Sequence, residues 1–308
     1  MRILITGSSG TIGSRLSETI SSKADIINLD IRPNKWLTNG NHSTTFVDLR
    51  NPEELDSLPD DIDLVVHLAA NARVYELVKE PSMAHDNTTM TFNMLEFMRI
   101  RGIKKIIFAS SRETYGNIMN YNPIAETEVR LENCESPYSA SKMAGEALIH
   151  SYSRVYGIGF VIIRFSNVYG MYDDSDRVIP LWIRECLQNN DLVVFGKDKS
   201  LDFTYIDDAV DAVIRIIDRF DEVRGNTFNI AYGMEIPLAR IAVQIKELTM
   251  ASSNIEMSNN RPGEVCKYQA DISKSKKLLG LNPCTDINEG LVKAIDWYKK
   301  ACNGGRIK

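Results

Sequence analysis

The chain opens with Arg2-Ile-Leu-Ile-Thr-Gly-Ser-Ser-Gly-Thr-Ile-Gly13, and the architecture follows from this stretch. An apolar run typical of a buried strand leads directly into Gly7, Gly10 and Gly13, and a helical pattern continues through Leu16 and Ile20. Glycines allow the backbone to turn tightly and approach a pyrophosphate, while the following helix directs its N-terminal amides at the negative charge. The spacing is one residue wider than the standard dinucleotide fingerprint. The stretch therefore predicts the phosphate-binding turn of a dinucleotide site.

An acidic residue stands where such a site needs one. The apolar run 26–29 ends in Asp30, seventeen residues after Gly13. A carboxylate at the end of the second strand accepts hydrogen bonds from the ribose hydroxyls and repels a 2′-phosphate. Although Arg32 lies close by, Asp30 favours NAD over NADP.

Strand-like and helical segments alternate through the first 170 residues. Apolar runs occur at 3–5, 26–29, 64–68, 106–109 and 160–165, and helical stretches include 81–101 and 137–156. This alternation predicts an α/β fold with a doubly wound parallel sheet of the Rossmann type. Polar residues follow the runs, and the carboxyl ends of parallel strands meet in one crevice, where the cofactor is expected.

Beyond Gly170 the pattern loosens, which suggests a second unit. We expect a Rossmann domain over residues 1–170 and a smaller substrate domain formed mainly by 171–308, with the chain returning to the sheet within 201–232. Helices are predicted near 177–189, 207–220, 237–250 and 288–300, and a strand at 192–195.

Composition narrows the class of protein. The 308 residues are 44% hydrophobic, enough for a large core, and a net charge of −5 provides no basic surface for nucleic acid. No apolar stretch approaches the roughly 20 residues of a membrane span. We expect no signal peptide, because a core strand begins at residue 2, and a cytoplasmic protein with reduced thiols, because the five cysteines form no Cys-x-x-Cys motif. The dispersed histidines indicate no metal site, and His67 is predicted to be a hydrogen-bonded core residue.

Tyr138 and Lys142 form a candidate catalytic pair. They are four residues apart in a predicted helix and so share one face. A phenol titrates near ~10, but a neighbouring ammonium group favours the phenolate and lowers that pKa toward working pH. The spacing therefore predicts a tyrosine general base, although the same spacing also occurs on ordinary solvated helices.

Together with other motifs, these residues resemble an extended short-chain dehydrogenase/reductase of the NAD-dependent sugar-nucleotide epimerase/dehydratase family, most closely the UDP-hexose 4-epimerases. The match runs nearly end to end. It is carried by the glycine turn, Asp48-Leu49, His67-Leu-Ala-Ala70, Pro81 with Asn87, Ser110-Ser-x-x-x-Tyr115-Gly116, Tyr138-x-x-x-Lys142, Arg164-Phe-Ser-Asn-Val-Tyr-Gly170, Asp202-Phe-Thr-Tyr-Ile-Asp-Asp208 and Arg261-Pro-Gly-Glu264.

The resemblance implies roles for the catalytic and cofactor residues. Tyr138 would take the proton of a sugar hydroxyl, Lys142 would lower the pKa of Tyr138 and bind the nicotinamide ribose, and Ser111 would hold the same sugar hydroxyl. The implied NAD contacts are Gly7, Gly10, Thr11, Ile12, Gly13, Asp30, Asp48, Leu49, Leu68, Ala69, Ala70, Asn87, Tyr138 and Lys142.

The resemblance also implies a substrate site for a nucleotide sugar, expected to be UDP-linked. Asn167 would hold a phosphate, Phe195 would lie beside the uracil and Arg261 would clamp the diphosphate. Tyr268 would fill the space beside the sugar's C2 substituent, so plain UDP-hexoses or their C6-oxidised acids are expected to be preferred over N-acetylated sugars. The full substrate set is Ser111, Glu113, Asn167, Arg177, Phe195, Arg261 and Tyr268.

Several departures from the family pattern bear on the reaction. Leu201 stands where relatives usually carry a diphosphate-binding Arg, and Arg177 could supply that charge. Arg112 replaces the acid of the 4,6-dehydratases, and a guanidinium cannot donate the required proton. Glu113 keeps the sugar-acid decarboxylases open. Arg112 and Arg73 could each face a uronic acid carboxylate, but a solvent-facing salt bridge is the favoured interpretation for both.

The predicted reaction is thus a 4-epimerisation through a transient 4-keto sugar, with NAD recycled. UDP-glucuronate epimerisation or decarboxylation and 4,6-dehydration or reduction are the alternatives within the family. A dehydrogenase with free cofactor exchange and a catalytically silent NAD-binding regulator are the alternatives outside it. A homodimer is expected through helices 81–101 and 137–156, whose apolar residues include Met83, Met90, Phe92, Met94, Phe97, Met143, Leu148 and Tyr152.

Overall fold

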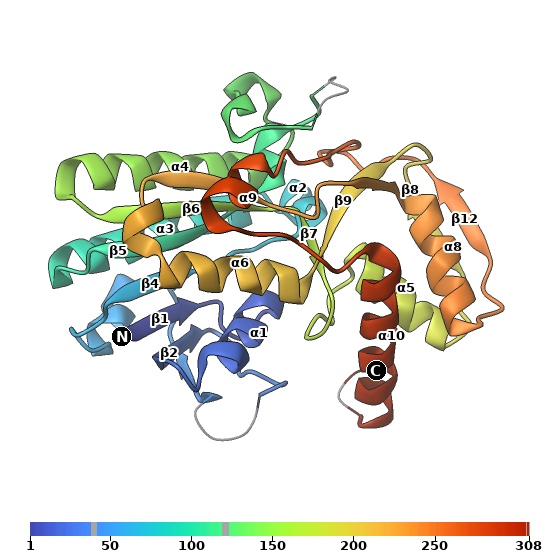
Figure 1. Cartoon of the computed structure of the whole chain (residues 1–308), viewed down its shortest axis with the longest axis horizontal. Helices are drawn as coiled ribbons and strands as arrows, with labels where there is room; N and C mark the ends of the chain where they lie inside the picture. Colours follow the sequence, from blue (N-terminus) through green and yellow to red (C-terminus); the bar gives the residue numbers. More distant parts are fainter. Residues whose placement is uncertain (38–41, 119–122, 306, 308) are drawn as a thin grey trace.

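The computed structural model describes residues 1–37, 42–118, 123–305 and 307. A seven-stranded parallel sheet lies at its centre, with the strand order β10-β6-β5-β4-β1-β2-β3 (Figure 1). The strands are β1 (Arg2–Thr6), β2 (Asp25–Asp30), β3 (Thr44–Phe46), β4 (Leu64–His67), β5 (Lys105–Ser111), β6 (Gly159–Phe165) and β10 (Asn226–Ile230). The predicted α/β fold with a doubly wound parallel sheet is confirmed.

Helices cover both faces of this sheet. Leu4 and Val65 pack in one core cluster with residues of α3 (Ser82–Arg101) and α4 (Pro137–Tyr156). Ile3 and Ile5 pack in another with residues of α1 (Thr11–Ile20) and α6 (Ile206–Asp218). Successive strand residues point to opposite faces, so burial of both faces accounts for the uninterrupted apolar runs of the sequence.

The strand order places the predicted crevice. β1 pairs with β2 on one side and with β4 on the other, so the order of the strands reverses at β1. Ligands of open α/β sheets bind beyond the carboxyl ends of the strands at such a reversal. The glycine turn after β1 therefore lies at the expected cofactor position.

Two smaller sheets lie beside the central one, towards the other end of the molecule in Figure 1. One has the order β11-β9-β7, from β7 (Asn167–Tyr169), β9 (Ser200–Tyr205) and β11 (Glu235–Pro237), and the other pairs β8 (Leu192–Phe195) with β12 (Ile255–Ser258). The remaining helices are α2 (Val74–Lys79), α5 (Val178–Leu187), α7 (Phe220–Val223), α8 (Leu238–Thr249), α9 (Ser273–Leu279) and α10 (Ile287–Asn303), with short 3₁₀ turns at Pro52–Ser57, Arg112–Tyr115, Glu126–Glu128 and Leu131–Asn133. Within the described ranges, no helix is long and apolar enough to cross a bilayer.

Candidate active site

The glycine turn after β1 lies in close contact with the loop after β4. Gly7 has φ +69°, and a Cβ there would lie 2.8 Å from the backbone nitrogen of Ala69. A Cβ on Gly13 would lie 2.3 Å from the carbonyl oxygen of Gly7. Only residues without a side chain allow the turn, the first turn of α1 and the loop after β4 to come this close. The tight turn places its backbone at the N-terminus of α1, the position where the pyrophosphate of a dinucleotide fits in sheets of this kind.

Neighbouring residues complete this cradle. Gly10 is the N-cap of α1, and the next residue, Thr11, donates its hydroxyl to the carbonyl of Tyr172 at 3.2 Å. The Asp30 carboxylate, at the end of β2, accepts hydrogen bonds from the backbone N–H groups of Ser9 at 3.0 Å and Arg32 at 3.1 Å. Asp30 is thus held against the glycine turn, where a ribose would follow the pyrophosphate.

Asp48, Leu49 and Asn87 differ in what they offer a cofactor. Asp48 pairs with Arg50 at 2.6 Å, and this hydrogen-bonded guanidinium lowers the pKa of Asp48. Leu49 is buried in the core. Asn87 exchanges hydrogen bonds with the backbone of Asn71 at 2.7 and 3.0 Å and also reaches Ser141 at 3.1 Å. Asn87 therefore ties the loop after β4 to α4.

The catalytic helix begins where the chemistry needs it. Ser136 and Ser139 form a reciprocal capping box, and Pro137 occupies the first turn, so α4 starts immediately before Tyr138. Ser111 ends β5 opposite this point, and its side chain acts on the phenol of Tyr138, lowering its pKa. The Lys142 ammonium lies 5.9 Å from the centre of the Tyr138 ring and donates to the Ala109 carbonyl at 2.7 Å. The structure thus brings the three predicted catalytic residues together.

The electrostatics of this trio differ from the sequence prediction. Burial raises the pKa of Tyr138 above that of a free phenol, opposed by the Ser111 hydrogen bond and by the charges of Arg177 and Arg112. Burial also lowers the pKa of Lys142 to about 8, against the charge of Glu146. The expected depression of the Tyr138 pKa is therefore wrong for the protein alone, because burial of the phenol outweighs the groups that favour the phenolate, and Lys142 is not among those groups.

On the sugar side, Arg261 lies close to two aromatic rings. Its guanidinium carbon lies 3.9 Å from the centre of the Phe195 ring and 4.9 Å from that of Tyr75, a residue the sequence did not single out. Rigid stacking of this kind holds the fork of an Arg in place for a diphosphate. Asn167 donates to the carbonyl of Asp202 at 3.0 Å. Arg177 pairs with Asp173 at 3.5 Å, and its charge reaches Tyr138.

Arg112 is buried, contrary to the prediction that it faces solvent. It lies beyond the end of β5, 6% exposed, and its guanidinium pairs with Glu113 at 2.7 Å. The same group donates to the Asn167 side chain at 3.3 Å and lies 5.6 Å from the centre of the Tyr268 ring. Arg73 does form the predicted partly exposed pairs, with Glu76 and Asp176.

Tyr268 lies deeper than its predicted place beside a sugar suggests. It is 1% exposed, its ring stacks on Tyr115 at 5.9 Å, and its hydroxyl makes no hydrogen bond within the part of the chain that the structure describes. Asp202 holds the segment that follows Tyr268. Its carboxylate accepts from the backbone N–H of Ala270 at 3.2 Å and from those of Tyr232 and Gly233, in another loop, at 3.1 and 3.0 Å. The sequence showed Asp202 only as part of a motif, since its three partners come from distant loops.

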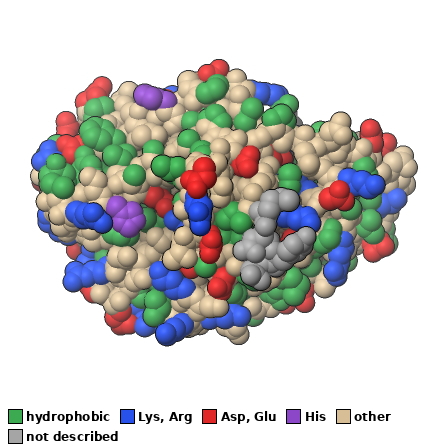
Figure 2. All heavy atoms as spheres, turned by 90° about the horizontal axis from the view of Figure 1, so that it is seen from above, with side chains coloured by type: hydrophobic (Ala, Val, Ile, Leu, Met, Phe, Trp, Pro, Cys, Tyr) green, Lys and Arg blue, Asp and Glu red, His purple; other side chains and the backbone are tan. Residues whose placement is uncertain are grey.

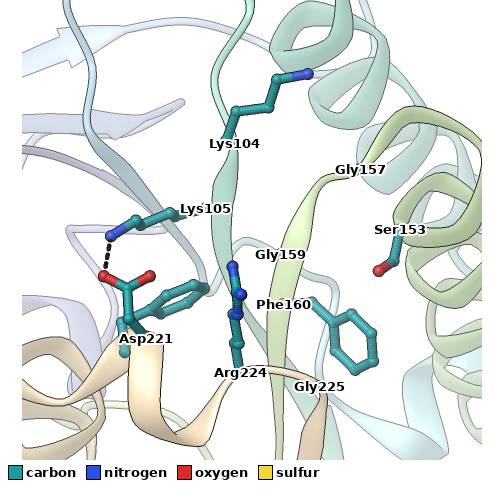
Figure 3. A pocket seen from close by; sticks show the side chains of 10 residues that line it. Lys104, Lys105, Ser153, Gly157, Gly159, Phe160, Asp221, Arg224 and Gly225 are labelled. Atoms are coloured by element: carbon teal, nitrogen blue, oxygen red, sulfur yellow. Dashed lines mark hydrogen bonds and ion pairs between the residues drawn. The ribbon is translucent and has the colours of Figure 1, made fainter.

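A separate cavity of about 390 Å³ lies at the amino ends of β5 and β6 (Figure 3). Its charged lining includes Lys105 and Asp221, which pair with each other at 2.7 Å. None of the predicted site residues lines this cavity, and it opens at the edge of the sheet opposite the glycine turn. Among the described residues, no group of three His, Cys, Asp or Glu side chains is placed to hold a metal ion.

Comparison with known proteins identifies the family. A model of the NAD dependent epimerase/dehydratase family matches residues 3–231, and the chain belongs to this family. It is an extended short-chain dehydrogenase/reductase, as the sequence motifs predicted.

Individual relatives are similar over nearly their whole length. A candidate UDP-glucose 4-epimerase of Methanocaldococcus jannaschii is 34% identical, with 96% of this chain and 98% of that protein covered. The structure of UDP-glucose 4-epimerase with UDP-glucose from Thermotoga maritima superposes with a TM-score of 0.89 at 26% identity, covering 98% of this chain and 100% of the other. That of UDP-glucuronic acid 4-epimerase from Bacillus cereus, with UDP-glucuronic acid and NAD, gives 0.88 at 27% identity, covering 97% and 99%. Such close scores do not separate the two sugars.

Proposed function

We propose that the protein is an NAD-dependent 4-epimerase of a UDP-hexose such as UDP-glucose or UDP-galactose, working through a transient 4-keto sugar. The observation that carries the proposal is the meeting of Ser111, Tyr138 and Lys142 at the carboxyl end of β5, on the same edge of the sheet as the glycine turn and Asp30.

Each residue has one chemical task in this reaction. Tyr138 removes the proton of the sugar's 4-hydroxyl and later returns it, and Ser111 donates a hydrogen bond to the oxygen that becomes a carbonyl. Lys142 supplies positive charge beside the phenolate. Gly7, Gly13 and Asp30 would hold NAD, which would supply a reversible hydride acceptor for C4.

The same residues argue against other reactions of the family. Arg112 stands where a dehydratase needs an acid, and its pairing with Glu113 engages the carboxylate that a dehydratase uses as a base. Elimination of water from C5 and C6 is therefore disfavoured. UDP-glucuronate epimerisation or decarboxylation is the runner-up because Arg112 is a buried cation.

Product analysis tests the proposal directly. The purified protein is incubated with NAD and separately with UDP-glucose, UDP-galactose, UDP-glucuronate, UDP-N-acetylglucosamine and dTDP-glucose, and the products are separated by chromatography. Interconversion of UDP-glucose and UDP-galactose without net NADH is expected. Accumulation of a keto-sugar, a pentose or stoichiometric NADH instead would overturn it.

We further propose the assignment of the parts of the chain. Residues 1–170, with the return within 201–232, would form the cofactor domain, and 171–308 mainly the sugar-nucleotide domain. Cytoplasmic function is consistent with the five cysteines, all of which are free thiols in the structure.

The homodimer expected from the sequence also remains a proposal. Three of the residues expected at the interface are buried in the core and cannot contact a partner: Met94, Phe97 and Tyr152. Exposed hydrophobic residues on the two helices are Phe92 and Ile100 of α3 and Val155 and Tyr156 of α4. Figure 2, viewed from the side of α4, shows hydrophobic side chains at several places on this surface. A monomeric mass by light scattering at micromolar concentration would refute the dimer.

A further inference from the structure

Three buried polar atoms beside the catalytic residues have no hydrogen-bond partner within the described part of the chain. They are Nη1 of Arg112, Oε2 of Glu113 and the hydroxyl of Tyr268. Each belongs to a side chain at least nine-tenths buried. A buried polar atom left unpaired costs about 1–3 kcal/mol, so a cluster of three indicates a ligand that completes them.

The cluster lies next to the position of the reacting carbon. Ser111, whose side chain acts on the phenol of Tyr138, accepts a hydrogen bond from the backbone N–H of Glu113 at 3.2 Å. The charges of both Arg112 and Glu113 act on the Tyr138 phenol. A sugar whose 4-hydroxyl contacts Ser111 and Tyr138 therefore presents the neighbouring substituents of its ring to Arg112 and Glu113.

The cations whose charges act on Tyr138 or Glu113 already have acidic partners: Arg177, whose charge reaches Tyr138, pairs with Asp173 at 3.5 Å. Arg112 pairs with Glu113 at 2.7 Å, Lys199 pairs with Glu264 at 2.5 Å, and the charges of Lys199 and Glu264 both act on Glu113. The buried carboxyl group of Asp202 also interacts with Arg112. A carboxylate on the substrate would add a further negative group to a desolvated cluster that already holds three acidic side chains.

A hydroxyl group suits the cluster better. A hydroxyl is both an acceptor, as Nη1 of Arg112 requires, and a donor, as Oε2 of Glu113 requires, so one group has the two functions that these unpartnered atoms need. Epimerisation also requires the hydride to leave one face of C4 and return to the other, so the ring must present both faces to a fixed cofactor. Turning the ring about its C1–C4 axis exchanges the C2–C3 side with the C5–C6 side. In a neutral hexose, both sides carry hydroxyls.

We propose that Arg112 and Glu113 act as a donor–acceptor pair that binds a sugar hydroxyl in both orientations of the ring, and so select hexoses with a C6 hydroxymethyl group over their uronic acids. This inference rests on the proposed 4-epimerase function and names its substrate class. It makes Arg112 and Glu113 specificity-determining residues, with no part in proton transfer.

The test compares kcat/KM for UDP-glucose and UDP-glucuronate in the NAD-loaded enzyme and in variants. The wild type is expected to favour UDP-glucose at least tenfold. Glu113→Gln keeps the size of the side chain and removes its charge, so the preference should fall at least tenfold through gain on UDP-glucuronate. Arg112→Lys should weaken both substrates. Arg73→Gln, which removes a partly exposed Arg from the neighbouring loop, is the matched control and should leave the ratio unchanged.

Three results would overturn the inference: a wild-type preference for UDP-glucuronate, an unchanged ratio in Glu113→Gln, or a changed ratio in Arg73→Gln alone. Should Glu113→Gln fail to fold, the wild-type rate on UDP-6-deoxyglucose replaces it; this rate is expected to be at least tenfold lower than the rate on UDP-glucose, and equal rates would overturn the inference. Binding of the two nucleotide sugars is measured in parallel by calorimetry. If no sugar is epimerised, the proposed function fails, while the binding preference and its loss in Glu113→Gln still decide the inference.

Discussion

On the cofactor side of the site, backbone groups and small residues form the binding surface, whereas on the sugar side buried charged side chains form it. Gly7 and Gly13 allow the turn to pack closely against the loop after β4 and the start of α1, because a side chain at either would strike neighbouring backbone. Arg112 and Glu113 instead hold charge away from water, with one unpaired atom on each. The first arrangement is fixed by local chain geometry. The second depends on residues that meet only after folding.

The largest expected effect falls between these two sides, at Tyr138. Tyr138→Phe removes one hydroxyl group from a buried side chain, so it should leave NAD binding intact and lower kcat by about 10³-fold, the range of lost general base catalysis. Turnover is measured by single-substrate assay with NAD at saturation. Tyr152→Phe, on the same helix but bonded to Glu96, is the control and should retain wild-type turnover. Near-normal turnover in Tyr138→Phe would remove Tyr138 as the base.

The next prediction tests the cofactor side. In Gly13→Ala, the new methyl group would lie 2.3 Å from the Gly7 carbonyl oxygen, so backbone must move. We expect NAD affinity to fall about 100-fold and stability to fall by about 1–3 kcal/mol, the usual range for overpacking. Titration calorimetry and urea unfolding measure the two effects.

Gly157→Ala provides the comparison for this variant. Gly157 caps α4 at φ +69°, and a Cβ added to it would meet no atom within 4 Å. The substitution should cost only the backbone strain, about 1 kcal/mol, and leave NAD affinity unchanged. Equal NAD affinity in Gly13→Ala and wild type would mean that the glycine turn does not bind the pyrophosphate.

The sequence predicted the cofactor side better than the sugar side for the same physical reason. The glycine spacing, the acid ending β2 and the Tyr138–Lys142 spacing are local patterns, and the structure places them where the patterns require. β7, β9, β11 and β12 were missed because short strands depend on partners far along the chain. Arg112 was expected in solvent because nothing nearby in the sequence shows that Asn167 and Tyr268 enclose it.

The pH dependence of turnover gives a third test. The pKa of Lys142 is about 8 and that of Tyr138 is above a free phenol's, while the active form needs an ammonium and a phenolate together. Below about pH 8, Lys142 is almost fully protonated, and the deprotonated fraction of Tyr138 rises tenfold per pH unit. We therefore expect kcat/KM to rise tenfold per pH unit in this range. Above about pH 8, the protonated fraction of Lys142 falls as fast as the deprotonated fraction of Tyr138 rises. The plot of kcat/KM against pH should therefore level.

Lys142→Arg separates the two groups, since an Arg stays charged throughout this range. Its rate will be lower, but its kcat/KM should continue to rise beyond pH 8, where the wild type levels. A break near pH 8 that persists in Lys142→Arg would show that another group causes it.

The smallest effect is expected at His67, a buried residue of β4 beneath the cofactor side. Its ring bonds Thr6 at 2.8 Å, and burial, with the nearby charge of Lys142, lowers its pKa to about 3. Below pH 6.5 the unfolded chain binds a proton at His67 that the native protein does not, so stability falls as pH falls, by about 1.4 kcal/mol per pH unit. The stability that depends on an unprotonated His67 is regained as the pH rises above 6.5. Because the unfolded His67 is already half protonated at pH 6.5, urea unfolding at pH 6.5 and 5.5 should show His67→Gln losing about 1 kcal/mol less than wild type. His150→Gln, at an exposed position of α4, should follow wild type. Equal losses in all three proteins would mean that His67 is protonated in the native state, and that the cofactor side too holds a buried charge.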